Sequence, residues 1–211
     1  MTVVVDYGAS NLQSVVNALT ELGEEARVAS APSELDDAER IILPGVGAMA
    51  PAMARLRKSG LAEALNEAVR ERGTPFLGIC LGMQMMASRG HEGGLETEGL
   101  GWVPGAAVRL EAAPPDWRVP HIGWTEIHAE NGFPLSDGLR RDAGFYFCHS
   151  YHVALDDDAY LAAEAAFDGA ITAALWRGSA IGVQFHPERS GNAGLRLIEG
   201  FLDWDGCGRD W

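Results

Sequence analysis

The sequence is poor in basic residues and in cysteine, and it has no long hydrophobic run. Lysine and arginine number 16 against 30 acidic residues, which gives a net charge of −14 that would repel nucleic acid. The three cysteines, Cys80, Cys148 and Cys207, have no framework spacing, which predicts free thiols in a reducing cytoplasm. No apolar run could cross a bilayer, and residues 1–7 lack the basic segment of a signal peptide. We therefore expect a cytoplasmic protein that binds neither nucleic acid nor membrane.

The residues that are present have the balance of a globular chain. The 211 residues are 47% hydrophobic and 22% charged, which is enough for a substantial core without disulfide bonds. No repeat, low-complexity linker or composition shift divides the chain, so a single domain over residues 1–211 is expected. The acidic run at 156–158 is interpreted as a solvated turn, and no metal site is predicted.

The first half of the sequence alternates between two periodicities. Short apolar runs typical of buried strands occupy residues 2–5, 25–29, 40–43 and 76–79. Helical spacing of apolar residues follows them at 11–22, 49–71 and 81–88. Alternating strands and helices predict right-handed crossovers and a parallel sheet covered on both faces.

The second half is dominated by strands. They are predicted at residues 108–110, 125–127, 145–147, 161–166, 171–176 and 181–185. Short turns separate the last three strands, which indicates an antiparallel meander, and a final helix is expected at 191–202. The predicted fold class is therefore α/β, with a mainly parallel central sheet, helices on both faces and an antiparallel C-terminal extension.

A cysteine stands at a predicted strand-to-helix turn. Residues 78–82 read Gly-Ile-Cys-Leu-Gly, and the glycines allow the tight backbone that exposes a nucleophilic side chain. A helix N-terminus activates a thiol and supplies N–H groups to an oxyanion. Taken alone, Cys80 could equally be a small buried hydrophobic residue.

A histidine and a glutamate follow the last predicted strand. His186 could take a proton from the Cys80 thiol and return it to a leaving amine, and Glu188 could orient the imidazole. Separately, each could be an ordinary core or surface residue. Their combination with a cysteine at such a turn in one parallel-sheet protein favours a catalytic site.

With these motifs the chain resembles the class I (triad) glutamine amidotransferases. Within that class it is most similar to the glutaminase subunits of imidazole glycerol phosphate synthase. The resemblance rests on residues 7–15, 43–48, 75–84, 120–124, 145–151 and 182–190. This family usually has glycine at Ser10, asparagine at Thr125, an apolar residue at Cys148 and lysine at Arg189.

The resemblance implies a role for each candidate residue. Cys80 would attack the side-chain amide of glutamine, His186 would relay protons and Glu188 would orient His186. The oxyanion hole would come from the glycine loop and the residue after the nucleophile: Gly45, Val46, Gly47 and Leu81. The substrate would be held by Gln84, Glu92, Ser150 and Tyr151. The partner interface would include Asn11, Trp124 and Arg189.

The resemblance also implies a partner and no cofactor. The expected partner is a (β/α)8-barrel cyclase subunit that receives ammonia, forming a heterodimer active in histidine biosynthesis. Three alternatives remain: a paralogous glutaminase that feeds a sugar amidotransferase, a catalytically silent docking subunit, and a free-standing cysteine hydrolase. The glycine loop would also suit phosphate binding or a plain turn, although the sequence has no GxxxxGK motif.

Overall fold

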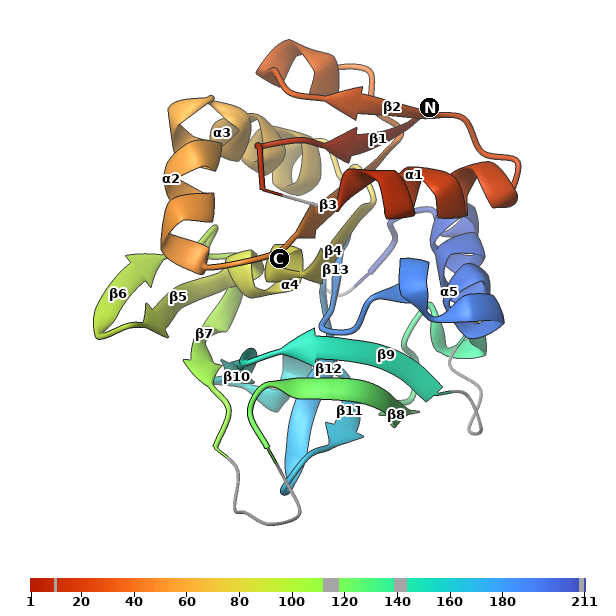
Figure 1. The fold of residues 1–211 in the computed structure, drawn as a ribbon. Coiled ribbons are helices and arrows are strands. Elements are labelled where there is room, and N and C mark those ends of the chain that lie inside the picture. Colours follow the sequence, from red (N-terminus) through yellow and green to blue (C-terminus); the bar gives the residue numbers. More distant parts are fainter. Residues whose placement is uncertain (10, 112–117, 139–143, 209–210) are drawn as a thin grey trace.

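A computed structural model describes residues 1–9, 11–111, 118–138, 144–208 and 211, so Ser10 lies outside the described residues. A nine-stranded sheet in the order β2-β1-β3-β4-β13-β12-β11-β8-β9 forms the centre of the molecule (Figure 1). Its first five strands are parallel: β1 (Thr2–Val5), β2 (Ala26–Ala29), β3 (Arg40–Gly45), β4 (Phe76–Cys80) and β13 (Ala180–Val183). Buried Val, Ile and Leu side chains dominate the inner strands because both faces of this sheet are covered.

The other strands of this sheet are antiparallel. They are β12 (Ala170–Arg177), β11 (Leu161–Ala166), β8 (His121–Ala129) and β9 (Gly144–His149). The predicted meander of the last three strands is confirmed, and so is the predicted fold class. The antiparallel part begins earlier in the chain than expected, because β8 and β9 extend the same sheet.

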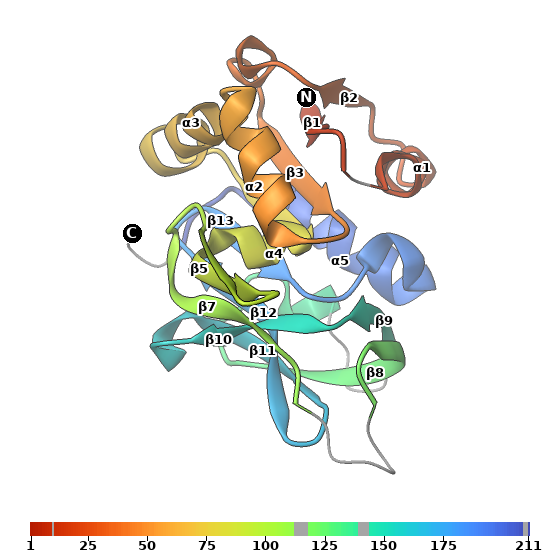
Figure 2. The same ribbon diagram turned by 60° about the vertical axis from the view of Figure 1, so that its left-hand side comes forward.

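A second sheet of four strands lies beside α4 and α2 (Figure 2). It consists of β10 (Tyr151–Leu155), β7 (Val103–Arg109), β5 (Ala87–Glu92) and β6 (Leu95–Glu98). The prediction of a helix over 81–88 was wrong at its end, because residues from Ala87 onward pair with β7 and β6. The strands β5, β6 and β10 were missed.

Helices cover both faces of the main sheet (Figure 1). One face carries α1 (Leu12–Glu21) and α5 (Gly191–Asp203), and the other carries α2 (Met49–Lys58), α3 (Leu61–Asn66) and α4 (Leu81–Met86). The single helix predicted over 49–71 is broken at Gly60, whose φ of 77° is left-handed, and it continues as α3 and the helical turn η2 (Glu67–Glu71). The remaining helical turns are η1 (Pro32–Leu35), η3 (Ser136–Gly138), η4 (Asp158–Tyr160) and η5 (Pro187–Arg189).

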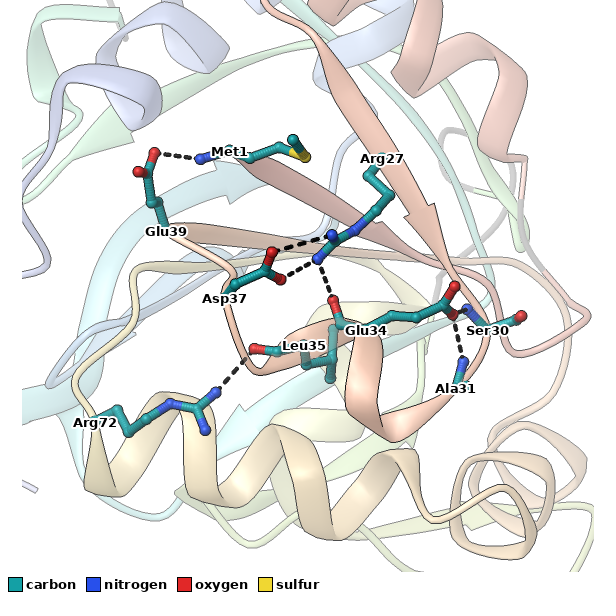
Figure 3. A network of polar contacts seen from close by, with 9 residues as sticks. All are labelled: Met1, Arg27, Ser30, Ala31, Glu34, Leu35, Asp37, Glu39 and Arg72. Carbon is teal, nitrogen blue, oxygen red and sulfur yellow. Dashed lines mark hydrogen bonds and ion pairs between the residues drawn. The ribbon is translucent and has the colours of Figure 1, made fainter.

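A polar network ties the sheet edge to its neighbouring turns (Figure 3). Arg27 on β2 donates to the Asp37 carboxylate and to the Glu34 carbonyl. The Glu34 carboxylate accepts the backbone N–H groups of Ser30 and Ala31, and these bonds lower its pKa. The network lies at the surface, so it fixes local geometry more than overall stability.

The C-terminal residue is anchored on the body of the protein. Trp211 packs edge-on against Trp102 with ring centroids 6.2 Å apart, and the Arg70 guanidinium lies 5.6 Å from its ring. Gly178 is required beneath it, since a Cβ there would overlap the indole. Among the helices of the described residues, none has the length and apolar character to span a membrane.

Candidate active site

Cys80 stands at the junction between β4 and α4, where glycines allow two elements to approach closely. Its own φ is 55°, a strained value for a residue with a side chain. A Cβ on Gly78 would lie 2.8 Å from the carbonyl of Gly82, and one on Gly82 would overlap the carbonyl oxygen of Leu43. The turn is therefore built for glycine on both sides of Cys80, and it presents the thiol at the carboxyl end of the sheet.

His186 and Glu188 reach Cys80 from the loop after β13. The His186 imidazole and the Cys80 thiol line the same cavity, and Cys80 is one of the groups that raise the pKa of His186. The His186 Nδ1 lies 2.8 Å from the Glu188 Oε1. The loop is clamped onto β9 by Ser190, whose hydroxyl donates to the His186 carbonyl at 2.6 Å and accepts the Tyr146 N–H at 3.0 Å. The structure thus brings the three predicted residues together, with His186 between the Cys80 thiol and the Glu188 carboxylate.

Electrostatics favour a charged imidazole in this line. Burial opposes protonation of His186, but its hydrogen bond to Glu188 and the nearby charges of Cys80 and Glu188 outweigh that effect. The pKa of His186 is raised to about 10. The Glu188 side chain is only 2% exposed, so water screens its charge poorly. Such a pair can deliver a sulfur nucleophile and then donate a proton to a leaving group.

A cavity of about 410 Å³ opens in front of Cys80. The candidate residues that line it beside Cys80 and His186 are Asn11, Val46, Gly47, Leu81, Gln84, Glu92, Ser150, Tyr151 and Arg189. Three candidates do not line it. Glu188 lies behind His186, Gly45 ends β3 in close contact with Tyr7 and Leu81, and Trp124 is 61% exposed on β8. The cavity is large enough for an amino acid.

The glycine loop does not aim the Val46 N–H at Cys80 in this structure. That N–H donates to the Ala9 carbonyl at 3.2 Å, while Gly47 has a left-handed φ of 92°. Leu81 is the first residue of α4, so its N–H has no partner within the helix. Of these two predicted oxyanion donors, the Leu81 N–H is thus not used within its helix, and the Val46 N–H is bonded to Ala9.

Glu92 and Gln84 enter the cavity with part of their hydrogen-bonding capacity already used. One Glu92 carboxylate oxygen accepts the Met49 N–H at 2.9 Å, at the start of α2. The Gln84 Nε2 donates to the Tyr151 carbonyl at 2.8 Å and to the Gln184 Oε1 at 3.2 Å. The Gln84 Oε1 is thus the atom left for a ligand, and it can only accept.

Aromatic and apolar side chains flank the mouth of the cavity. The Arg189 guanidinium lies 5.1 Å from the Tyr146 ring, and Trp124 lies edge-on to Tyr146 at 6.1 Å. Ile122, on the same side of β8 as Trp124, is 59% exposed. Exposed apolar groups gathered on one strand are typical of a docking surface.

Four residues near Cys80 were not predicted from the sequence. Gln184 is fully buried, with its Nε2 3.6 Å from the Cys80 Sγ. His121 and His149 are buried cross-strand partners beside the cavity. The Tyr7 ring is buried against Gly45. Only Gln184 had a usable signal, as a polar residue in the apolar strand predicted at 181–185, two positions before His186.

Comparisons with known proteins assign this geometry to a family. The model described as glutamine amidotransferase class-I matches residues 3–203. The chain belongs to the class I glutamine amidotransferases. One relative, the imidazole glycerol phosphate synthase subunit HisH of Cereibacter sphaeroides, is 44% identical over 97% of this chain and 99% of its own length. The subunit of that name from Zymomonas mobilis is 43% identical over 96% of this chain and 95% of its own.

Solved structures agree with this amidotransferase in fold. PurLQS from Thermotoga maritima superposes with a TM-score of 0.74 at 20% identity, covering 96% of this chain and 97% of that one. The crystal structure of another glutamine amidotransferase superposes with a TM-score of 0.73 at 19% identity, covering 95% of this chain and 97% of that one. At these identities the likeness concerns the fold alone.

Proposed function

We propose that this amidotransferase is the glutaminase subunit of an imidazole glycerol phosphate synthase. It would hydrolyse glutamine to glutamate and ammonia and pass the ammonia to a partner cyclase in histidine biosynthesis. The observation that carries the proposal is the line of Cys80, His186 and Glu188 at the floor of an amino-acid-sized cavity. Relatives named for that synthase, at 44% and 43% identity over nearly the whole chain, support the choice of acceptor.

The first half-reaction is acyl transfer to sulfur. The Cys80 sulfur attacks the side-chain amide carbon of glutamine, and the carbonyl π electrons move to oxygen to give a tetrahedral oxyanion. His186, charged at neutral pH, gives its proton to the amide nitrogen. The carbon–nitrogen bond then breaks, releasing NH3 and leaving a γ-glutamyl thioester on Cys80.

The second half-reaction restores the enzyme. His186, now neutral, takes a proton from water as the water oxygen attacks the thioester carbon. The carbon–sulfur bond breaks and glutamate leaves. Cys80 is then again a thiolate beside the protonated His186. Glu188 holds the imidazole by its bond to Nδ1, so that Nε2 serves the reacting atoms in both steps.

Substrate positioning follows from the atoms left free in the cavity. The Gln84 Oε1 and the second Glu92 oxygen are acceptors suited to the N–H groups of the substrate. Backbone N–H groups at Ser150 and Tyr151 would receive its carboxylate. Leu81 and, once released from Ala9, Val46 would donate to the oxyanion, with Gly45 and Gly47 allowing the rearrangement.

The partner would be a (β/α)8-barrel cyclase docked over the mouth of the cavity, contacting Asn11, Trp124 and Arg189. Ammonia in bulk water at neutral pH is mostly protonated and is no nucleophile, so a sheltered route between the subunits preserves its reactivity. The net charge of −14 suits a basic surface on the partner. We place this one-domain subunit, residues 1–211, in the cytoplasm, where its cysteines stay reduced.

The test separates the ammonia source from the synthesis. In a complex with the cognate cyclase, Cys80→Ser should abolish glutamine-dependent synthesis and preserve synthesis from added ammonium salt. Cys207→Ser, at an exposed thiol outside the cavity, is the matched control and should retain both activities. Glutamine-dependent turnover by Cys80→Ser would overturn the mechanism. Activation by a sugar synthase in place of the cyclase would move the acceptor to the paralogous alternative.

A further inference from the structure

A continuous line of hydrogen bonds runs from strand β8 to the Cys80 sulfur. Its members are Thr125, His121, His149, the Tyr151 carbonyl, Gln84 and Gln184. The side chains of His121, His149 and Gln84 are almost fully buried, and that of Gln184 is fully buried. These polar groups therefore have little access to water. Each must make its hydrogen bonds with its neighbours in the line.

One backbone carbonyl sets the direction of every bond. The Tyr151 oxygen lies 2.9 Å from the His149 Nδ1 and 2.8 Å from the Gln84 Nε2. A carbonyl oxygen can only accept, so both neighbours must present N–H groups to it. This fixes the amide orientation of Gln84 and places a proton on Nδ1 of His149.

Toward the nucleophile, the order of donors and acceptors is forced. The second N–H of the Gln84 amide points at Gln184, so the atom that faces it at 3.2 Å is the Gln184 carbonyl oxygen, Oε1. The other end of the same amide must then be Nε2, which lies 3.6 Å from the Cys80 Sγ. A donor, and not a lone pair, therefore faces the sulfur, and a thiolate is stabilised by that donor.

Toward the surface, the order depends on His149 being neutral. The pKa of His149 is lowered to about 3, mainly by burial and in smaller part by the neighbouring imidazoles of His121, His152 and His186. The neutral ring with a proton on Nδ1 has an accepting Nε2, so the His121 Nδ1 at 3.2 Å donates to it.

The outer end of the line is a hydroxyl. Because the His121 Nδ1 carries the proton, its Nε2 accepts from the Thr125 Oγ1 at 2.8 Å. Stacking on Phe147, with ring centroids 4.8 Å apart, keeps the His121 ring in this plane. Thr125 is next to Trp124 on β8, so the line begins at the strand that borders the mouth of the cavity.

We propose that Gln184 is a catalytic residue that donates a hydrogen bond to the Cys80 sulfur, and that Thr125, His121 and His149 are positioning residues that lock this donor in place. This role rests on the proposed function of Cys80 as nucleophile. The line explains a buried amide beside a thiol, which would otherwise be an unused polar group in the core. It also makes the reactivity of the sulfur depend on a hydroxyl on the exposed strand.

The first experiment measures the sulfur directly, without glutamine or a partner. The purified chain with Cys148→Ser and Cys207→Ser is alkylated with iodoacetamide at pH 7, and the rate at Cys80 is followed by mass spectrometry. Gln184→Met keeps the length of the side chain and removes the donor, so the rate should fall about tenfold or more. An unchanged rate in a variant with the parent circular dichroism spectrum would overturn the role of Gln184.

The second experiment tests the outer end with a matched pair. Thr125→Val keeps the shape and removes the hydroxyl, and Thr125→Ser keeps the hydroxyl. Alkylation of Cys80 should slow at least twofold in the valine variant and match the parent in the serine variant. Equal rates in the two variants would exclude Thr125 from the line.

The third measurement determines the protonation state and tautomer of His121 and His149. Nitrogen-15 spectra of the imidazoles at pH 7 should show His121 and His149 both neutral with the proton on Nδ1. An Nε2–H tautomer or a charged ring at either position would overturn the proposal. These three measurements need no glutamine turnover. A chain without glutaminase activity can therefore still confirm the hydrogen-bond line, and an active glutaminase can still contradict it.

Discussion

Val46 donates its backbone N–H to the carbonyl of Ala9 over 3.2 Å, in the loop that lies across the cavity from Cys80. An N–H group engaged in this way cannot serve a developing oxyanion. A lost oxyanion donor costs roughly 10²–10³ in rate, so, with Val46 as the proposed donor, we expect low glutaminase activity until this loop rearranges. Partner docking at the adjacent surface is the expected trigger.

The freedom of this loop can be tested at Gly47. Its φ is 92° and no other atom lies within 4 Å of a Cβ placed on it, so Gly47→Ala adds backbone strain without a clash. With the cognate cyclase present, glutamine-dependent synthesis should fall by up to about 10²–10³-fold while ammonia-dependent synthesis is preserved. Steady-state assays with the two nitrogen sources measure this.

Gly23 provides the matched control for strain. It has a φ of 77°, is equally open and follows helix α1 at a distance from the cavity. Gly23→Ala should lower the unfolding free energy by about 1–2 kcal/mol, as Gly47→Ala does, and leave both activities intact. Equal losses of glutamine-dependent activity in the two variants would show that strain alone, and not oxyanion geometry, is responsible.

Replacing Glu188 should lower glutaminase activity less than replacing His186, the base that it orients. Glu188→Gln keeps the shape and removes the charge that helps to hold the pKa of His186 near 10. The kcat for glutamine should fall about 10²–10⁴-fold, and His186→Ala should lose more because no group then moves the proton. Glu199→Gln, at an exposed site on α5, controls for the change in net charge.

The fold was predictable where local pattern and tertiary environment agree. The valine run at β1, the helical spacing of α1 and the alanine-rich strand β11 lie where expected, within a residue or two. The strand β5 was missed because its residues, Ala-Ser-Arg-Gly-His-Glu, have neither alternation nor β propensity, and only pairing with β7 and β6 makes them a strand.

The site was predictable as a motif and not as a network. Cys80, His186 and Glu188 are recognisable by residue type and by their place at strand ends. The contact between His121 and His149 depends on the register of β8 against β9, which pairs these two positions. The register of two strands is set by the whole sheet. The spacing of residues along the chain therefore does not predict the contact between His121 and His149.

Tyr7 carries a buried hydroxyl that has no hydrogen-bond partner among the described residues. Burial is the main cause that raises its pKa above the ordinary value. An unmade hydrogen bond costs about 1–3 kcal/mol, so Tyr7→Phe should leave the unfolding free energy unchanged or raise it by up to about 1 kcal/mol. Urea unfolding followed by tryptophan fluorescence measures this. A loss above about 1 kcal/mol would contradict the prediction.

His149 should make the fold sensitive to mild acid. Its folded pKa of about 3 lies below the ordinary value of 6.5, so the unfolded chain binds the proton first. The stability from this neutral ring is present above pH 6.5 and is lost as the pH falls toward 3. Between pH 7 and 5 the loss is on the order of 2 kcal/mol for one such group.

The measurement is the unfolding free energy at pH 7, 6 and 5, in the parent and in His149→Gln. The variant should start lower, because it breaks the bond to Tyr151, and then lose less between pH 7 and 5. His91→Gln is the control, since His91 is 47% exposed and should follow the parent. Carboxylates whose pKa is lowered, such as Glu34 and Asp37, titrate below this window and are common to all three proteins. Parallel pH profiles for parent and His149→Gln would show that the buried ring is not what titrates.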